Sequence, residues 1–250
     1  MVLANSVEKT SGKSEISGFV IAGGKSSRLK LDKVLLPWHG DTLLGHAVER
    51  VRQVCGSVTV CADRKDLGPH LPQSCEIICD ALPNAGPLAG IVSGLERSHT
   101  EWNLFLAVDL PLLPVALLAA LVERAESMPT AIAGTLCILP QMNGLLQPLC
   151  GLYHHSLRDG LRGALEEGKY KVMLALREAL LRAEGRDPLV GRGLGRGEAA
   201  PLGTPDSSVE LLDAIAFAAR SADLNTDARD WFLNINTPED WQRAREIAAI

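Results

Sequence analysis

The sequence predicts a single α/β domain with a doubly wound, mainly parallel sheet. Short apolar runs alternate with segments of helical periodicity along most of the 250 residues, which is the pattern of successive βαβ units joined by right-handed crossovers. Hydrophobic residues make up 46% of the chain and charged residues 22%. This is an ordinary globular balance, and at this length it allows a sizeable core to be buried.

Apolar runs bounded by turn residues predict strands at residues 19–22, 57–62, 76–79, 103–108, 130–133, 147–153 and 231–236. Apolar positions at helical spacing predict helices at residues 42–55, 87–97, 115–125, 155–167, 171–183, 209–220 and 237–248. Thr42 is a suitable N-cap for the first helix. The last helix starts with Thr237, Pro238 and, three residues after the threonine, Asp240, which is typical of a capped helix start.

Two segments fall outside this alternation. Residues 1–17 are polar with mixed charge, and we expect a disordered leader there. Residues 184–208 contain six glycines, three prolines and three arginines, a composition that predicts a flexible insert because it buries too little apolar area to offset its ordering entropy. The folded domain is therefore expected to comprise residues 18–183 and 209–250.

The overall charge argues against nucleic acid as a partner. The chain carries 25 basic and 30 acidic residues, a formal net charge of −5, and few aromatic side chains, whereas nucleic-acid binding requires a basic face and often stacking platforms. An anionic ligand must therefore meet positive charge that is concentrated locally.

Neither a membrane span nor a secretory signal is apparent in the sequence. The most apolar stretch, 110–122, is interrupted by Pro111 and Pro114, and the N-terminus lacks an apolar signal region. The six cysteines are scattered, without a C-x-x-C pair. We expect buried reduced thiols and a cytoplasmic protein, although a metal site or disulfide at Cys75 and Cys79 is an alternative.

A glycine-rich basic loop follows the first predicted strand and is the strongest functional signal. Residues 22–33 read Ala-Gly-Gly-Lys-Ser-Ser-Arg-Leu-Lys-Leu-Asp-Lys. Glycines allow the backbone to approach phosphate oxygens, and Lys25, Arg28 and Lys33 supply fixed positive charge. The spacing matches neither a P-loop nor a dinucleotide-binding fingerprint. A solvated basic turn is the alternative, but the clustered charge favours phosphate binding.

Two carboxylates end predicted strands. Asp80 follows residues 76–79 and Asp109 follows residues 103–108. In a parallel sheet both would lie on the same edge as the glycine loop, where a carboxylate beside phosphates is an expected Mg²⁺ ligand. Asp109 is the stronger candidate, since apolar residues continue directly up to it. A turn cap for Asp109 and a plain surface loop for Asp80 are the structural alternatives.

Weaker signals lie further along the chain. Residues 86–90, Gly-Pro-Leu-Ala-Gly, open a helix with small side chains that permit either a ligand or a tightly packed helix to approach. Asn234 and Asn236 alternate on the last predicted strand, so they would face one side together. His154 and His155 have no acidic partner at a useful spacing and are interpreted as a surface pair.

Taken together, these motifs resemble the molybdenum cofactor guanylyltransferase (MobA) family of nucleotidyltransferases. The resemblance covers residues 18–183 and 230–248, with the motifs in the same order: 22–28, 32–37, Asp80, 86–91, 109–111, 147–149 and 234–240. It implies a Rossmann-like fold and Mg²⁺-dependent transfer of GMP from GTP to the terminal phosphate of Mo-molybdopterin, with release of pyrophosphate. It also implies molybdoenzyme apoproteins or their chaperones as further partners.

The resemblance assigns roles residue by residue. The nucleotide would be bound by Ala22, Gly23, Gly24, Lys25, Lys33, Asp63, Asp80 and Asp109. Lys33, Arg28 and Asp109 would act in catalysis, with Asp109 holding the metal. Asn234 and Asn236 would flank the pterin.

Several positions depart from the family pattern. Leu29-Lys30 stands where Met-Gly is usual, Cys61 or Asp63 replaces an Asn after the second strand, and Ala107-Val108 precedes Asp109 where Pro-Cys is usual. Two alternatives follow: a nucleotidyltransferase that uses CTP or another acceptor such as a sugar phosphate, or a GTP-binding cofactor-delivery protein without catalysis.

Overall fold

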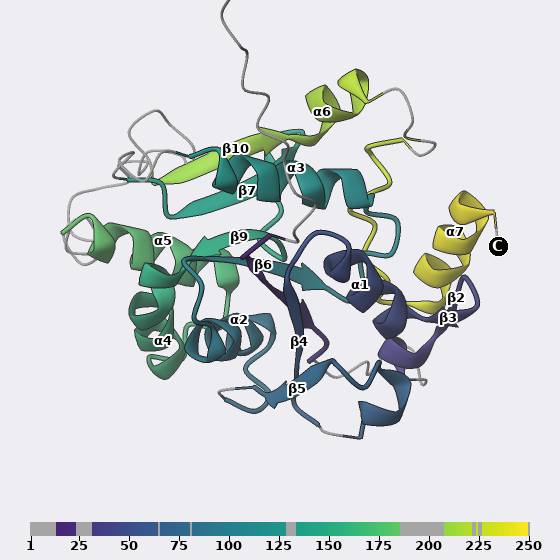
Figure 1. The fold of residues 1–250 in the computed structure, drawn as a ribbon, viewed down its shortest axis with the longest axis horizontal. Coiled ribbons are helices and arrows are strands. Elements are labelled where there is room, and N and C mark those ends of the chain that lie inside the picture. The colour runs from purple at the N-terminus through teal and green to yellow at the C-terminus, as the bar shows by residue number, and fades with distance from the viewer. Residues whose placement is uncertain are drawn as a thin grey trace, which may run out of the picture.

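The computed structural model describes residues 14–23, 32–64, 66–80, 82–128, 134–185, 208–221, 224 and 227–249. Within these residues one eight-stranded sheet runs in the order β10-β7-β9-β6-β1-β4-β5, with β8 paired to β7 (Figure 1). The strands are β1 (Ser17–Ile21), β4 (Ser57–Ala62), β5 (Glu76–Cys79), β6 (Trp102–Ala107), β7 (Cys137–Met142), β8 (Leu145–Leu146), β9 (Cys150–His154) and β10 (Val209–Asp213). β1, β4, β5 and β6 are parallel neighbours, and β9 is inserted antiparallel between β6 and β7. The prediction of a mainly parallel α/β sheet is confirmed.

Helices cover both faces of the sheet, and the alternation of side chains explains why. In β1, Val20 belongs to one apolar cluster and Phe19 to the other. The first cluster includes buried residues of α1 (Leu43–Arg52), α3 (Val115–Glu126), α6 (Ala214–Arg220) and α7 (Pro238–Ala248). The second includes those of α2 (Pro87–Arg97), α4 (Arg158–Glu166) and α5 (Val172–Ala183).

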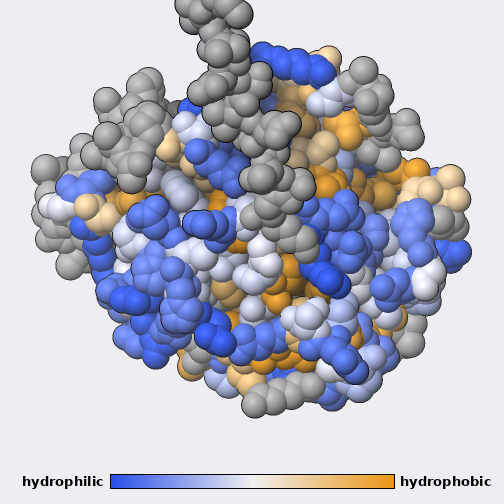
Figure 2. Space-filling model, viewed as in Figure 1, coloured by the Kyte–Doolittle hydropathy of each residue, from blue (hydrophilic) through white to orange (hydrophobic). Residues whose placement is uncertain are grey.

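The remaining elements are short. They are the 3-10 turns η1 (Lys33–Leu35), η2 (Gly68–His70) and η3 (His155–Leu157), and the two-stranded hairpin of β2 (Pro37–Trp38) and β3 (Asp41–Thr42). None of the helices in the described part of the chain is long and apolar enough to cross a membrane. Figure 2 shows hydrophilic residues over the region of α2 and α4. There Arg162 of α4 joins α2 through its ion pair with Glu96 and also pairs with Glu166 within α4.

Most predicted elements are present with shifts of a few residues. Thr42 caps α1 by accepting a hydrogen bond from the Gly45 amide, as expected. α7 starts with the capping box of Thr237 and Asp240 and ends at Ala248. The predicted helix at 155–167 is a 3-10 turn followed by α4. The strand predicted at 147–153 is β9, which begins only at Cys150.

Two predictions near the C-terminus are wrong. Residues 209–220 are not one helix: β10 pairs in parallel with β7, and the helix α6 begins only after Asp213, whose carboxylate caps it. Pairing with a neighbouring strand outweighs the local helical pattern of the apolar side chains. Residues 231–236 form no strand. Their chain folds through turns that bury Trp231 and Ile235 in the core.

The central region and the cysteines also differ in part. The strand predicted at 130–133 lies entirely outside the described residues, as residues 129–133 are not described. The next strand along the chain is β7, which was not predicted. Cys55, Cys61, Cys137 and Cys150 are buried free thiols as expected, but Cys75 is half-buried and Cys79 is exposed. The described residues contain no group of three or more metal-ligating side chains of the His, Cys, Asp or Glu type.

Candidate nucleotidyl-transfer site

The carboxyl ends of the parallel strands converge at one edge of the sheet. The Ala22 amide donates to Cys61 O at 2.8 Å, and the Val108 amide donates to Ile21 O at 3.1 Å. The Asp80 amide donates in turn to Ala62 O at 3.2 Å. These bonds extend the ladders one residue beyond β1, β5 and β6, so the segments that follow the strands start side by side, at the edge where open α/β sheets bind ligands.

Lys33 connects three distant parts of the chain at this edge. Its ammonium lies 2.6 Å from Asp109 Oδ2 and donates to Asn236 Oδ1 at 3.1 Å. The partners are 76 and 203 residues away in the sequence. The side chains of Lys33 and Asp109 are only 14% and 16% exposed, so their attraction is less screened by water than that of a surface pair.

Local structure holds each member of this trio. Lys33 is the first residue of η1. The backbone carbonyl of Asp109 accepts from the Ile235 amide at 3.1 Å, which attaches the segment before α7 to the end of β6. The amides of Asn236 and Thr237 both donate to Asp240 Oδ2. Burial acts to raise the pKa of Asp240, but these hydrogen bonds outweigh it and hold the pKa below its usual value.

Asp80 lies against the glycine that ends the first strand. A Cβ atom on Gly23 would come within 2.4 Å of Asp80 Oδ2, and one on Gly90 in α2 would lie 3.5 Å from Asp80 Oδ1. The absence of a side chain at Gly23 therefore makes room for this carboxyl group, whereas a Cβ at Gly90 would be in ordinary contact with it. Burial, together with the nearby charge of Asp63, raises the pKa of Asp80 to about 6.

Both strand-end carboxylates retain a buried oxygen that has no hydrogen-bond partner among the described residues. These atoms are Asp80 Oδ1 and Asp109 Oδ1. Buried polar atoms are normally paired, and an exception at a sheet edge points to a ligand or an ion. The Lys33 ammonium satisfies only the other oxygen of Asp109.

The remaining predicted site residues differ in where the structure places them. Gly24, Lys25 and Arg28 lie outside the described residues. Ala22 is buried at the edge, whereas Asp63 is exposed on the turn after β4. Asn234 does not share the contacts of Asn236, since its amide donates to Phe232 O at 3.3 Å. The two asparagines do not alternate on a strand, because the chain there is irregular.

One ion pair beside the site was not anticipated. Arg64, after β4, pairs with Asp32 next to Lys33 and also with Asp66, with Nε 3.2 Å from Asp66 Oδ1. It neutralises the single acid in the stretch 23–33, which carries four basic residues. The order of residues gave no indication of this pair, because its members follow different strands.

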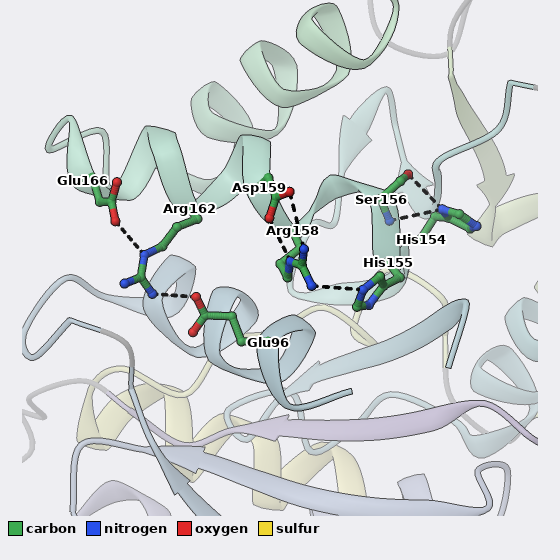
Figure 3. A network of polar contacts seen from close by, with 8 residues as sticks. All are labelled: Glu96, His154, His155, Ser156, Arg158, Asp159, Arg162 and Glu166. Carbon is green, nitrogen blue, oxygen red and sulfur yellow. Dashed lines mark hydrogen bonds and ion pairs between the residues drawn. The ribbon is translucent and has the colours of Figure 1, made fainter. Parts of the chain in front are cut away.

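The two adjacent histidines belong to another part of the surface, as the sequence suggested. His154 Nδ1 lies 2.8 Å from Ser156 Oγ. His155 Nε2 lies 3.4 Å from the Arg158 guanidinium, which also pairs with Asp159 (Figure 3). This arrangement connects η3 with α4, and none of its contacts involves Lys33, Asp80 or Asp109.

Comparison with known proteins identifies the family. Residues 18–183 match the MobA-like NTP transferase domain, which covers β1 through α5. The chain belongs to this family. The matched range of this MobA-like protein contains Gly23, Lys33, Asp80 and Asp109. Asn236 lies outside it.

Individual relatives agree with this assignment. The protein is 34% identical over 164 residues to a probable molybdenum cofactor guanylyltransferase of Chloroflexus aggregans, a match covering 64% of this chain and 76% of the relative. It is 33% identical over 165 residues to the molybdenum cofactor guanylyltransferase of Ralstonia nicotianae, covering 64% and 80% respectively. The crystal structure of molybdopterin-guanine dinucleotide biosynthesis protein A from Archaeoglobus fulgidus has the same fold, with a TM-score of 0.66 and 21% identity over 94% of this chain and 99% of that one.

Proposed function

We propose that this MobA-like protein is a molybdenum cofactor guanylyltransferase that transfers GMP from GTP to the terminal phosphate of Mo-molybdopterin. An oxygen of the acceptor phosphate forms a bond to the α-phosphorus of GTP. The bond from that phosphorus to the oxygen bridging to the β-phosphorus breaks, and pyrophosphate leaves with the electron pair. The products are molybdopterin guanine dinucleotide and pyrophosphate.

The observation that carries this proposal is the contact of Lys33 with Asp109 and Asn236. It brings a cation, an acid and an amide from three separate motifs to the sheet edge. Because the attacking phosphate is already ionised at neutral pH, the reaction needs no strong general base. Positioning and charge neutralisation supply most of the acceleration, and a half-buried lysine held in place by an acid and an amide can provide both.

The protein's own residues take distinct roles in this scheme. Lys33 neutralises charge on the phosphates of GTP, assisted by Lys25 and Arg28 of the same loop. Gly23 and Gly24 let the backbone approach the nucleotide, with Ala22 and Asp63 beside it, and Asp80 accepts hydrogen bonds from the guanine or ribose. Asn236 and Asn234 flank the pterin, Asn236 being the one in contact with Lys33.

The donor set at Asp109 fits Mg²⁺. Its Oδ1 atom is buried and unpartnered in the described part of the chain, and Mg²⁺ is commonly bound by one or two carboxylates together with substrate phosphates and water. Asp109 would hold the ion, which supplies positive charge to the oxygens around the α-phosphorus when bound. The ion pair with Lys33 holds the other oxygen of Asp109, Oδ2, in place.

A pyrophosphate-release assay tests the function. We expect release that requires GTP, molybdopterin and a divalent ion together, with CTP and UTP much less effective. Preference for CTP, or release of pyrophosphate with a sugar phosphate as acceptor, would favour the hypothesis of a nucleotidyltransferase with another substrate. GTP binding without any pyrophosphate release would favour the hypothesis of a cofactor-delivery protein without catalysis. Either result would contradict the proposal. Recipient molybdoenzymes or their chaperones are proposed downstream partners in the cytoplasm.

Two substitutions test the residues assigned to the reaction. Asp109→Asn and Lys33→Ala should each lower kcat by on the order of 10²–10³, the usual effect of removing one electrostatic contact with the transition state. Circular dichroism should show an unchanged fold. Arg97→Ala is a matched control, since Arg97 pairs with Glu76 on the surface and contacts none of these groups. A wild-type rate in either site variant would overturn the assignment.

A further inference from the structure

A buried arginine lies under the loop that follows Asp109. Arg50, in α1, is only 4% exposed. Its Nη1 atom donates to Leu110 O at 2.8 Å and to Leu113 O at 2.7 Å, and it lies 3.4 Å from Pro111 O. Burial lowers the pKa of Arg50 to about 10, so the guanidinium is charged at neutral pH.

The same helix provides a second donor one turn earlier. His46 Nε2 lies 3.3 Å from Pro111 O; since a carbonyl only accepts, this nitrogen carries the proton. Burial, with a contribution from Arg50, lowers the pKa of His46 to about 4, so the ring is neutral at pH 7. α1 therefore binds the loop through two side chains spaced i and i+4, which lie on one helix face.

Arg50 has no counter-charge that would explain its burial. Within the described part of the chain no carboxylate pairs with it, and its Nε and Nη2 atoms have no hydrogen-bond partner. A buried charge without an ionic partner is costly unless hydrogen bonds compensate it, and for Arg50 the carbonyls of the loop provide this compensation. The sequence carried a signal, because Arg50 interrupts the apolar stripe of α1 between Ala47 and Val51.

The loop needs such support because it contains no regular structure. Residues 108–114 connect β6 to α3, and the part after Asp109 includes Pro111 and Pro114, which have no amide hydrogen to donate. Its leucines are buried. The Leu113 amide donates to Leu110 O at 3.4 Å, and Arg50 and His46 supply the further side-chain donors to the carbonyls of the loop. The residue directly before the loop is Asp109, which contacts Lys33 and, through its backbone, Ile235.

We propose that Arg50 is a positioning residue for the transfer reaction, holding the loop 110–113 so that the Asp109 carboxylate is set for Lys33 and the metal ion. This inference rests on the proposed function. It predicts a specific kinetic pattern: apart from Asp109, the residues proposed to bind GTP follow β1, β4 and β5, away from the loop that Arg50 contacts, so the KM for GTP should change little when Arg50 is replaced. The step that depends on Asp109 should slow strongly.

The test uses Arg50→Met, Arg50→Lys and the control Arg52→Met in the full-length protein. Arg52 is on the same helix, is 37% exposed and lies 3.9 Å from Glu49. Arg52→Met therefore removes the same guanidinium group from a residue that does not contact the loop. Arg50→Met should lower kcat by about 10²-fold, the effect of a displacement of about 1 Å at a reacting group, with the KM for GTP within about threefold. Arg50→Lys, which keeps the positive charge but offers a single donor nitrogen, should be intermediate.

Two measurements separate positioning from a general structural role and do not require turnover. The first is the affinity for Mn²⁺ in the presence of GTP, followed by electron paramagnetic resonance. It should fall about tenfold in Arg50→Met, as expected for a misplaced ligand, and stay at the wild-type value in Arg52→Met. The second is hydrogen exchange of the Leu110, Leu112 and Leu113 amides, which should accelerate only in the Arg50 variants.

The outcomes distinguish this inference from the proposed function. If the wild-type protein releases no pyrophosphate, the proposed function fails, while metal affinity and amide exchange still report on Arg50. If Arg50→Met keeps wild-type kcat and Mn²⁺ affinity, or if Arg52→Met loses as much, the positioning role is overturned. Failure of both Arg50→Met and Arg50→Lys to fold would assign Arg50 to folding and would overturn it as well.

Discussion

Asp80 shows how a single carboxyl group responds to the sheet edge. Its Oδ2 lies against Gly23, and its Oδ1 is buried and unpaired within the described residues. Desolvation raises its pKa from 3.8 to about 6, with Asp63 contributing. A raised pKa means that the folded protein favours the protonated form. The contribution of Asp80 to stability is then fully present below pH 4 and is lost as the pH rises through about 6.

The substitution Asp80→Asn should therefore stabilise the protein at pH 7 and not at pH 4. A shift of this size corresponds to at most about 3 kcal/mol, and because the group is partly exposed, screening by solvent reduces the expected gain to about 1 kcal/mol. Urea denaturation at the two pH values measures it. A control, Asp63→Asn, should lower the pKa of Asp80 in an NMR titration. An equal gain at pH 4 and pH 7 would contradict this account.

Among the elements, α7 is important because Asn236, the residue before its N-cap Thr237, contacts Lys33. Thr237 accepts from the Asp240 amide at 3.2 Å, and Asp240 accepts from the amides of Asn236 and Thr237. This capping box satisfies amides at the helix start. It also fixes the backbone beside Asn236, so helix capping and site geometry depend on the same bonds.

Removing the cap should cost measurable stability. Thr237→Ala is expected to lower the free energy of unfolding by about 1 kcal/mol, the usual value for an N-cap threonine, and to weaken the Lys33–Asn236 contact. Glu239→Gln is a matched control in the same turn; it makes no capping bond, and its effect should stay within about 0.5 kcal/mol. Urea midpoints of the two variants decide the matter: similar losses in both would mean that the capping box is not the stabilising feature.

At the scale of the whole molecule, the flexible insert at 184–208 stays a prediction, because residues 186–207 lie outside the described part of the chain. The structure around it is informative. α5 ends at Ala183 and β10 begins at Val209, and Ser208 Oγ donates to Glu184 Oε1 at 2.7 Å. The two ends of the insert are therefore adjacent, and a short connection is long enough to join them.

Replacing residues 187–206 by a short Gly/Ser linker should preserve both the fold and the activity. Closing a shorter loop changes the free energy of unfolding by only about 0.6 kcal/mol for each halving of its length, and the groups assigned to the reaction lie elsewhere. Thermal unfolding and pyrophosphate release measure the two effects. Retained folding with lost activity would show that the insert takes part in substrate binding, contrary to this expectation.

Local patterns were sufficient for most elements and for the candidate residues. Apolar periodicity and capping residues identified β1, β4, β5, β6 and the helices α1, α2, α3, α5 and α7, because these signals act within a few residues of the chain. Strand-end positions also placed Asp80 and Asp109 at one edge, since parallel strands align their carboxyl ends. The family resemblance rested on the same short motifs and is confirmed by the matched domain.

Other features depended on contacts between distant segments. The pairing of β10 with β7, the turns at 231–236, the meeting of Lys33 with Asn236 and the burial of Arg50 beneath the loop after Asp109 all join residues far apart in sequence. Such contacts depend on which surfaces become adjacent when the core closes, and propensity within one segment carries no information about them. Composition, periodicity and short motifs thus sufficed for most elements and for choosing the candidate residues, whereas packing selected which amide reaches the lysine and which arginine contacts the loop after the aspartate.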